Sequence, residues 1–248
     1  DSYKKLPEMV SSLQICGEVT KEASADTGLR PGTPVSAGLQ DVNASVLGVG
    51  AFEEGEVVII LGTFGIDLIV LSSLPEKEKT FGYFSTVHGV PDRWLLSLGD
   101  PNFGSVIDWG IQMFFQKELQ ESERLGISIY EYLDAKLHNL TPKGGVYFLP
   151  YLFGSVDQPS AKAGFNGIGA WHTNLDMMRA IYEGICFTQL GNIERLESFS
   201  KLSRIRVVGG GAQGDFLCQM LADILGMQIE VTQSAEFATR GAAITAGI

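Results

Sequence analysis

Three consecutive glycines stand near the end of the sequence, where a strand would pass into a helix. The apolar run at residues 205–208 predicts the strand, and the glycines at residues 209–211 follow it directly. Apolar residues at helical spacing begin after Asp215 and stop at Gly226, which is typical of a helix C-cap. Backbone without side chains can approach a ligand closely, and the N–H groups of a first helical turn have no internal partner. The stretch suits a phosphate-bearing ligand, although a simple packed turn would need the same glycines.

Two other positions carry groups that could do chemistry on a phosphate. Asp41 lies between a predicted strand and a predicted helix of small residues, where free N–H groups and the helix dipole favour a charged carboxylate. Thr63 lies at the tip of a predicted hairpin, between β-branched runs at residues 56–61 and 66–71. Its backbone N–H and hydroxyl could both reach a phosphate. Taken singly, helix capping and an ordinary hairpin turn also explain these two residues.

The order of predicted elements indicates an α/β protein. Further strands are predicted at residues 16–19, 80–83, 94–98, 146–152 and 228–232. Helices are predicted at residues 21–27, 42–48, 102–116 and 128–138. A long helix is predicted with Asn174 as its N-cap, and a final helix is predicted to start at residue 239. These elements are the framework that must bring the glycine turn, the hairpin tip and the carboxylate together.

The composition narrows the class of partner. A formal net charge of −11 argues against nucleic acid and anionic membranes. There is no apolar run of membrane-spanning length and no signal peptide. The three cysteines are odd in number and stand at no metal-binding spacing, which favours reduced thiols and a cytoplasmic location: Cys16, Cys186 and Cys218. The three histidines are isolated, which favours structural or surface roles.

A dinucleotide site is the strongest alternative for the glycine turn. Gly209, Gly211 and Gly214 satisfy the pattern G-x-G-x-x-G after a strand, and Glu230 follows about twenty residues later, where an acid would bind a ribose. This reading predicts an NAD-dependent oxidoreductase. The preceding part of the chain favours it less, because it has the pattern of a β-meander with inserted helices instead of half of a doubly wound sheet.

Taken together, these stretches resemble the FGGY carbohydrate kinases, the relatives of glycerol kinase, xylulokinase and ribulokinase. The segment at residues 164–183 is the most specific part, because it pairs an aromatic–glycine turn with an Asp-x-x-x-Ala-x-x-Glu helix. The other matching parts are residues 37–41, 62–65, 209–212 with Gln219 and Asp223, and 239–243.

The resemblance implies two actin-like, RNase H-like domains with a cleft between them. Residues 1–54 would be the C-terminal part of the first, sugar-binding domain, and residues 55–248 would be most of the second, nucleotide-binding domain. We therefore expect a fragment of a longer polypeptide that binds adenine nucleotide weakly by itself and lacks kinase activity. The whole protein would be an ATP-dependent kinase for a small sugar.

The resemblance also assigns roles to single residues. Asp41 would be the catalytic base that takes the proton from the sugar hydroxyl as it attacks the γ-phosphate. Gly62 and Thr63 would contact the phosphates, and Gly104 would border the nucleotide. The ribose and adenine would lie against the glycine turn, at Gly210, Gly211, Ala212 and Asp215. Mg²⁺ would neutralise the triphosphate, with no residue of this chain assigned as its ligand.

Several residues depart from the usual family pattern. Gln40 and Val42 flank Asp41, where many members have Gly-Asp-Asn. The pattern Gln-Asp-Val is more similar to that of the kinases of L-xylulose and related ketoses or polyols. Phe64 stands where a small residue is usual, and Asp215 replaces an amide seen in some relatives. We therefore expect a pentulose or polyol substrate, and the resemblance leaves room for a homodimer. A non-catalytic, actin-like nucleotide-binding module remains a further alternative.

Overall fold

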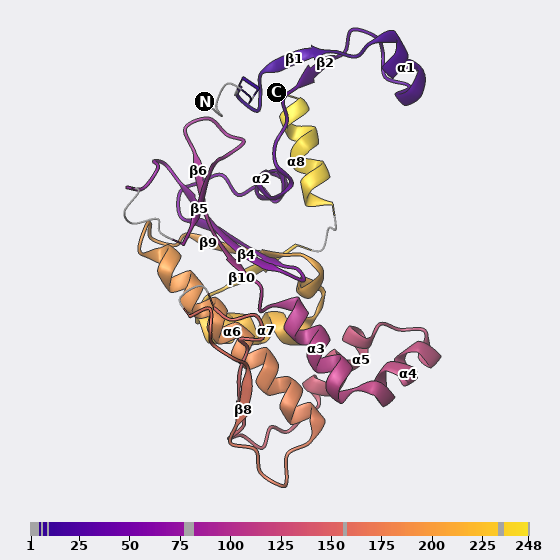
Figure 1. The fold of residues 1–248 in the computed structure, drawn as a ribbon, viewed down its shortest axis with the longest axis vertical. Coiled ribbons are helices and arrows are strands. Elements are labelled where there is room, and N and C mark those ends of the chain that lie inside the picture. The colour runs from indigo at the N-terminus through magenta and orange to yellow at the C-terminus, as the bar shows by residue number, and fades with distance from the viewer. Residues whose placement is uncertain are drawn as a thin grey trace. The chain divides into compact units, whose positions relative to one another are not determined.

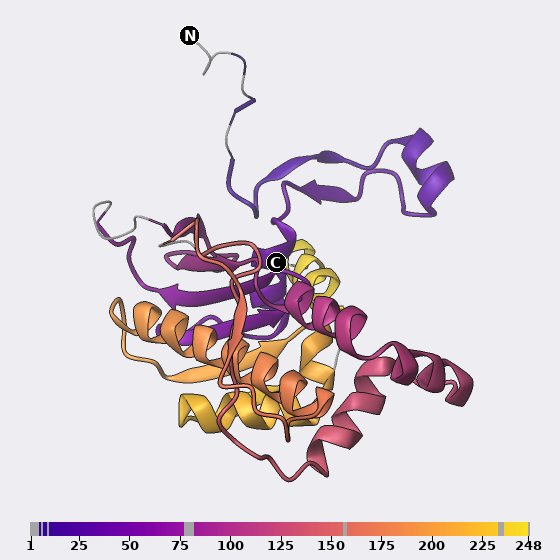
Figure 2. The same ribbon diagram turned by 60° about the horizontal axis from the view of Figure 1, so that its bottom comes forward.

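The computed structural model describes residues 5, 7–8, 10–76, 82–155, 158–232 and 236–247. The chain divides into two compact units, which are described separately. Unit 1 consists of Asp1–Phe52, Val87–Arg93 and Glu236–Ile248, and unit 2 of Glu53–Thr86 and Trp94–Ala235. Figures 1 and 2 show the elements of both units.

The described residues of unit 1 form a small hairpin and three α-helices. Strand β1 (Ile15–Glu18) pairs antiparallel with β2 (Pro34–Ser36), and α1 (Lys21–Thr27) lies between them in sequence. Helix α1 begins and ends as predicted, since the Thr20 hydroxyl accepts from the N–H of Ala23 and Gly28 is left-handed at φ +75°. Helix α2 (Asp41–Gly48) packs against α8 (Phe237–Ala246).

Glycines allow α2 and α8 to touch backbone to backbone. A Cβ added to Gly48 would lie 2.0 Å from the carbonyl oxygen of Phe237. A Cβ added to Gly241 would lie 1.8 Å from the carbonyl oxygen of Ala44. No other side chain fits at either position, so the pattern of small residues in both helices sets their separation.

Unit 2 is organised around a six-stranded sheet in the order β10-β9-β3-β4-β6-β5. The strands are β3 (Glu56–Leu61), β4 (Gly65–Leu71), β5 (Phe84–Val87), β6 (Trp94–Asp100), β9 (Arg204–Val208) and β10 (Ile229–Val231). Strands β3, β4 and β6 pair antiparallel, which confirms the predicted hairpin and meander. Strand β9 runs parallel to both β3 and β10. A doubly wound dinucleotide-binding sheet would be parallel in its central strands, and this one is not.

Helices cover one face of this sheet (Figures 1 and 2). The helices on this face are α3 (Gly104–Phe114), α6 (Asn174–Glu197) and α7 (Asp215–Leu225); α4 (Gln116–Leu125) and α5 (Ile129–His138) pack against these helices and not against the strands. The main core lies between this face and α3, α6 and α7; its sheet residues include Val57, Ile59, Leu61, Ile69, Leu96, Leu98, Ile205 and Val207. Strands β7 (Tyr147–Leu149) and β8 (Gly164–Asn166) form a separate short antiparallel pair beside α6.

Several predicted elements differ from the structure. The helix predicted over residues 102–116 breaks at Phe115, whose buried side chain separates α3 from the unpredicted α4. The buried strand predicted at residues 146–152 is only β7, with Tyr147 and Leu149 exposed. Thr173, not Asn174, caps α6. For the strand predicted at residues 80–83, residues 80 and 81 lie outside the described residues, and 82 and 83 are not in a strand. No helix in the described part of the chain is long and apolar enough to cross a membrane.

Candidate functional site

A cavity of about 960 Å³ lies within unit 2. One end of it is formed by the three turns that follow β3, β6 and β9, which are rich in glycine. The other end is formed by side chains of α3, α5 and α7. Of the residues predicted to bind a nucleotide, the structure brings six to this cavity: Gly62, Thr63, Gly104, Gly210, Gly211 and Asp215.

The hairpin turn after β3 is joined to the start of α3. The N–H of Gly104 donates to the carbonyl of Gly62 at 3.2 Å, and the N–H of Ser105 donates to the carbonyl of Thr63 at 3.1 Å. A Cβ on Gly104 would lie 2.6 Å from the Gly62 oxygen, so only glycine permits this approach. The two turn carbonyls are thereby used by α3. Among the described residues, neither the Thr63 hydroxyl nor its N–H has a hydrogen-bond partner.

The glycines after β9 serve different purposes. Gly209 is left-handed at φ +99°, and a Cβ there would lie 2.7 Å from the carbonyl oxygen of Leu61. A Cβ on Gly211 would lie 2.9 Å from the Leu61 Cβ, so both glycines are required for packing on the end of β3. A Cβ on Gly210 would have no neighbour within 4 Å. Gly210 lines the cavity, so a ligand could approach the backbone there.

Ala212 is the one predicted nucleotide-binding residue that does not line the cavity. It is buried, and its N–H donates to the carbonyl of Gly209 at 3.2 Å within a short 3₁₀ helix (Gly210–Gln213). Its carbonyl faces the thiol of Cys218 at 3.6 Å. Ala212 therefore stabilises the turn by packing and by its hydrogen bond to Gly209, and does not face the cavity.

Helix α5 supplies a carboxylate that the sequence analysis did not identify. Asp134 lines the cavity, and its Oδ1 accepts from the N–H of Phe216 at 3.0 Å in the first turn of α7. Gly214, the N-cap residue of α7, has no side chain with which to cap the helix. Asp134 therefore caps α7 from a different helix and stabilises its positive end. His138 Nε2 lies 3.5 Å from the other oxygen of the same carboxylate.

Acidic and hydroxyl groups gather at this end of the cavity. The Tyr130 hydroxyl of α5 donates to Asp108 of α3, which joins the two helices. Burial, reinforced by Asp108, raises the pKa of Tyr130 to about 12. Glu131 also lines the cavity. Glu131, Asp134 and His138 recur at helical spacing after the cap at Ser128, and this pattern could have marked α5 as a cavity wall.

Comparisons with known proteins decide the family. Residues 57–248 match the C-terminal domain of the FGGY family of carbohydrate kinases, and residues 2–48 match its N-terminal domain. The chain belongs to the FGGY family. This confirms the resemblance inferred from the motifs. The predicted domain division at residues 54 and 55 stays a prediction, and by contacts Glu236–Ile248 belongs to the same unit as α2.

Individual relatives agree with this assignment. The L-xylulose/3-keto-L-gulonate kinase of Escherichia coli (strain K12) is 32% identical over 247 residues, covering 98% of this chain and 47% of that protein. The crystal structure of xylulose kinase from Rhodospirillum rubrum has a TM-score of 0.81 at 26% identity, covering 96% of this chain and 47% of that one. Plasmodium falciparum glycerol kinase with ADP shares the fold, with a TM-score of 0.82, 23% identity, and 99% and 48% coverage. The chain thus spans about half the length of these FGGY relatives and has their α/β, actin-like fold.

The predicted base of this FGGY chain, Asp41, lies in unit 1. It is the first residue of α2, and Gln40 occupies the N-cap position without a side-chain hydrogen bond. The exposed Asp41 carboxylate accepts from the N–H of Val42 at 2.8 Å through Oδ1. The helix start was therefore predicted one residue too late. The role of Asp41 in phosphoryl transfer stays a prediction.

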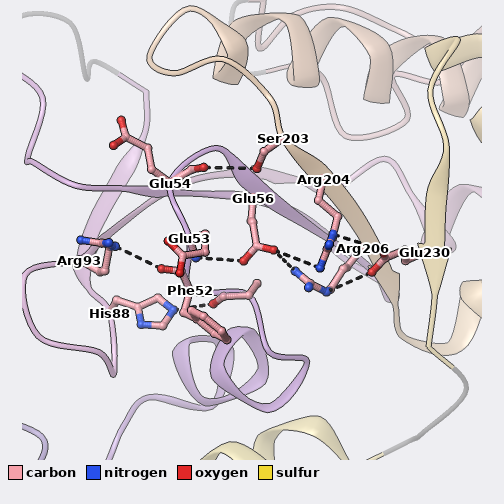
Figure 3. Close-up of polar contacts among 11 residues, drawn as sticks. Phe52, Glu53, Glu54, Glu56, His88, Arg93, Ser203, Arg204, Arg206 and Glu230 are labelled. Carbon is pink, nitrogen blue, oxygen red and sulfur yellow. Dashed lines mark hydrogen bonds and ion pairs between the residues drawn. The ribbon is translucent and has the colours of Figure 1, made fainter.

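Glu230, the acidic residue that a dinucleotide site would need, forms ion pairs with arginines. Glu230 pairs with Arg204 at 3.2 Å and with Arg206 at 3.4 Å, and Arg206 also pairs with the buried Glu56 at 2.8 Å. Figure 3 shows these four side chains converging across β3, β9 and β10. Glu230 is not among the residues that line the cavity. It serves in this ion-pair network, which argues against a ribose-binding role.

Proposed function

We propose that this chain is part of an ATP-dependent carbohydrate kinase that transfers the γ-phosphate of ATP to a hydroxyl of a pentulose or polyol. One observation carries the proposal. Residues from three separate turns, chosen from the sequence for a nucleotide, line a single cavity of unit 2. Family membership supports the same reading, because the matched family consists of carbohydrate kinases.

The two ends of the cavity suit different parts of ATP. The phosphates would lie at the glycine end, where Thr63 offers a hydroxyl and an N–H and Gly210 leaves the backbone accessible. The ribose and adenine would lie toward α5 and α7. Carboxylates such as Asp134 and Asp215 can accept hydrogen bonds from ribose hydroxyls and from the adenine amino group, but they would repel phosphate.

The residues present also fit the use of Mg²⁺. Within the described part of the chain, no group of three or more acidic, histidine or cysteine side chains could hold a metal by itself. Mg²⁺ commonly binds through phosphate oxygens, water and one or two carboxylates, without a dedicated protein cage. When bound, it would neutralise charge on the transferred phosphoryl group.

Asp41 would act as the catalytic base. A carboxylate at the exposed start of α2 is stabilised in its charged form by the Val42 N–H and by the helix dipole. It could hold the substrate hydroxyl in line with the γ-phosphate and accept its proton as the new O–P bond forms. The relatives named as L-xylulose and xylulose kinases support a pentulose as the acceptor. We keep a cytoplasmic location and a homodimer as predictions.

Two measurements test the proposed function. Calorimetric titration of this chain should show binding of ATP. NAD and GTP should bind more weakly than ATP or not at all. A coupled ADP-release screen of pentuloses, hexuloses and polyols should find a substrate for the polypeptide that contains this chain at the length of its relatives. Binding of NAD in preference to ATP, or no ADP release with any of these acceptors, would contradict the proposal.

A further inference from the structure

Helix α5 lines the cavity along two adjacent rows of its surface. Residues four apart are neighbours on a helix, so Tyr130, Asp134 and His138 form one row, and Glu131 and Ala135 form the next. All five of these residues line the cavity. One face of α5 is therefore a continuous wall, and Tyr130 supplies the largest apolar side chain in it.

This wall is fastened to both of the other helices that line the cavity. The Tyr130 hydroxyl donates to the carboxylate of Asp108 on α3. Four residues along the same row, Asp134 Oδ1 accepts from the N–H of Phe216 on α7 at 3.0 Å. The ring of Tyr130 is thus held by the helix backbone at one end and by a hydrogen bond at the other. A ring held in this way loses little conformational freedom when a ligand packs against it.

Exposure distinguishes Tyr130 from the other aromatic residues of the cavity. Phe103 and Tyr182 also line it, but they are 2% and 5% exposed and belong to the core, whereas Tyr130 is 48% exposed. The ring of His138 packs edge-on against Phe216, with the ring centroids 5.4 Å apart. A tyrosine that only joined α3 to α5 would be more stable with its ring buried as well. Tyr130 instead keeps about half of its surface accessible beside a cavity.

An accessible, fixed aromatic ring suits a planar aromatic ligand. Nucleic-acid bases stack on tyrosine rings, and every base has a face that can do so. The other end of the same cavity carries the hydroxyl and N–H of Thr63 and the open backbone of Gly210, which suit phosphates. The two ends together therefore suit a ligand with a base at one end and phosphates at the other.

We propose that Tyr130 is the platform on which the base of the nucleotide stacks, and that Asp108 is the positioning residue that holds this ring through its hydroxyl. The inference rests on the proposed function and names the residue that recognises the base in that same site. Stacking recognises that a base is present more than which edge it carries. Tyr130 therefore distinguishes a nucleotide from a simple polyphosphate.

Calorimetric titration of this chain with ATP measures what the ring contributes. Loss of an aromatic platform weakens binding by about 5-fold to 140-fold, so Tyr130→Ala should raise the Kd of ATP by a factor in this range. Tyr130→Phe keeps the ring without its hydrogen bond, and the Kd should rise about threefold because the ring is then ordered only on binding. Tyr147→Ala is the matched control, since Tyr147 is 66% exposed and does not line the cavity. Its Kd should equal that of the wild type.

A double-mutant cycle tests the role of Asp108. Asp108→Ala breaks the same hydrogen bond from the other side and should cost as much affinity as Tyr130→Phe. The double variant should cost no more than either single variant, because only one bond is lost. Asp108→Asn keeps an oxygen acceptor for the hydroxyl and should bind ATP as the wild type does. Additive losses in the double variant would overturn the positioning role.

Tyrosine NMR separates stacking from a purely structural role. In the chain with isotope-labelled tyrosine rings, the signal that is absent from Tyr130→Phe belongs to Tyr130. Saturating ATP should shift this signal, because the adenine ring current acts on a ring stacked against it. Inorganic tripolyphosphate, which has no ring, should leave the signal in place. This measurement uses the wild-type chain and stays decisive even if Tyr130→Ala fails to fold.

The possible outcomes distinguish this inference from the proposed function. Unchanged ATP affinity in Tyr130→Ala, or a Tyr130 signal that saturating ATP does not shift, would overturn the inference. The proposed function would survive either result, because ATP would still bind. No binding of ATP by the wild-type chain would contradict both. Weaker ATP binding in Tyr130→Ala together with a shifted Tyr130 signal would establish the platform.

Discussion

Replacement of Gly104 by alanine tests the joint between the hairpin turn and α3. The new Cβ would lie 2.6 Å from the carbonyl oxygen of Gly62 and 3.0 Å from the Cα of Thr63. Ordinary contacts begin near 3.4 Å, so the turn or the helix must move by about 0.8 Å. Both contacts are with backbone, so no flexible side chain can move aside.

The size of the effect follows from what this movement breaks. The hydrogen bonds from Gly104 to Gly62, at 3.2 Å, and from Ser105 to Thr63, at 3.1 Å, would lengthen beyond hydrogen-bonding range. Each contributes about 1 kcal/mol, and the overpacking itself costs roughly 1–3 kcal/mol. We expect Gly104→Ala to reduce the unfolding free energy by roughly 3–5 kcal/mol and to weaken ATP binding at least tenfold, because Thr63 moves with the turn.

Guanidinium unfolding with a matched control measures this effect. Gly191 lies within α6, and a Cβ there would meet nothing within 4 Å. Gly191→Ala should therefore stabilise the chain by about 0.5–1 kcal/mol and leave ATP binding unchanged. A Gly104→Ala protein as stable as the wild type would refute the argument from the close contact. A destabilised protein with unchanged ATP affinity would instead show that the turn is not part of the nucleotide site.

Three other substitutions address separate parts of the site. Asp134→Ala should cost about 1 kcal/mol in urea unfolding, because the Phe216 N–H loses its cap, whereas Asp134→Asn should stay close to the wild type. The unfolding free energy of the wild type should fall by about 3 kcal/mol from pH 4 to pH 7 relative to Asp67→Asn, because burial raises the pKa of Asp67 from 3.8 to about 7 and the folded chain holds a proton that the unfolded chain releases; a parallel pH profile in the variant would contradict this. In the whole protein, Asp41→Asn should lower kcat by about a hundredfold or more with ATP affinity close to unchanged, and unchanged turnover would favour a non-catalytic module.

Local signals in the sequence predicted much of the fold. The hairpin of β3 and β4 follows from two β-branched runs around a glycine-containing turn. The Ser128 hydroxyl does accept from the N–H of Glu131, and Gly226 does end α7 in the left-handed conformation. Each of these features depends on residues a few positions apart. A single segment therefore contains the information needed to predict it.

The features that the sequence did not reveal depend on distant partners. Asp67 lies within the apolar run of β4, and its hydrogen-bond partner Asn192 is 125 positions away. The cap that Asp134 provides for α7 joins residues 82 positions apart. Helix α4 is mostly polar, and of its residues only Ser122 is buried, so no apolar stripe marked it. In each instance the residue type is ordinary and only the folded neighbourhood makes it informative.

The distribution of charge in the cavity explains how an acidic chain could bind a polyanion. With a formal net charge of −11, the protein as a whole does not attract a triphosphate. The carboxylates that line the cavity belong to α3, α5 and α7, whereas the turns after β3 and β9 present backbone N–H groups and the Thr63 hydroxyl. Fixed dipoles at short range can exceed a screened repulsion from distant charges. The same division orients the ligand, because a nucleotide inserted the other way would place its phosphates against Asp134 and Glu131.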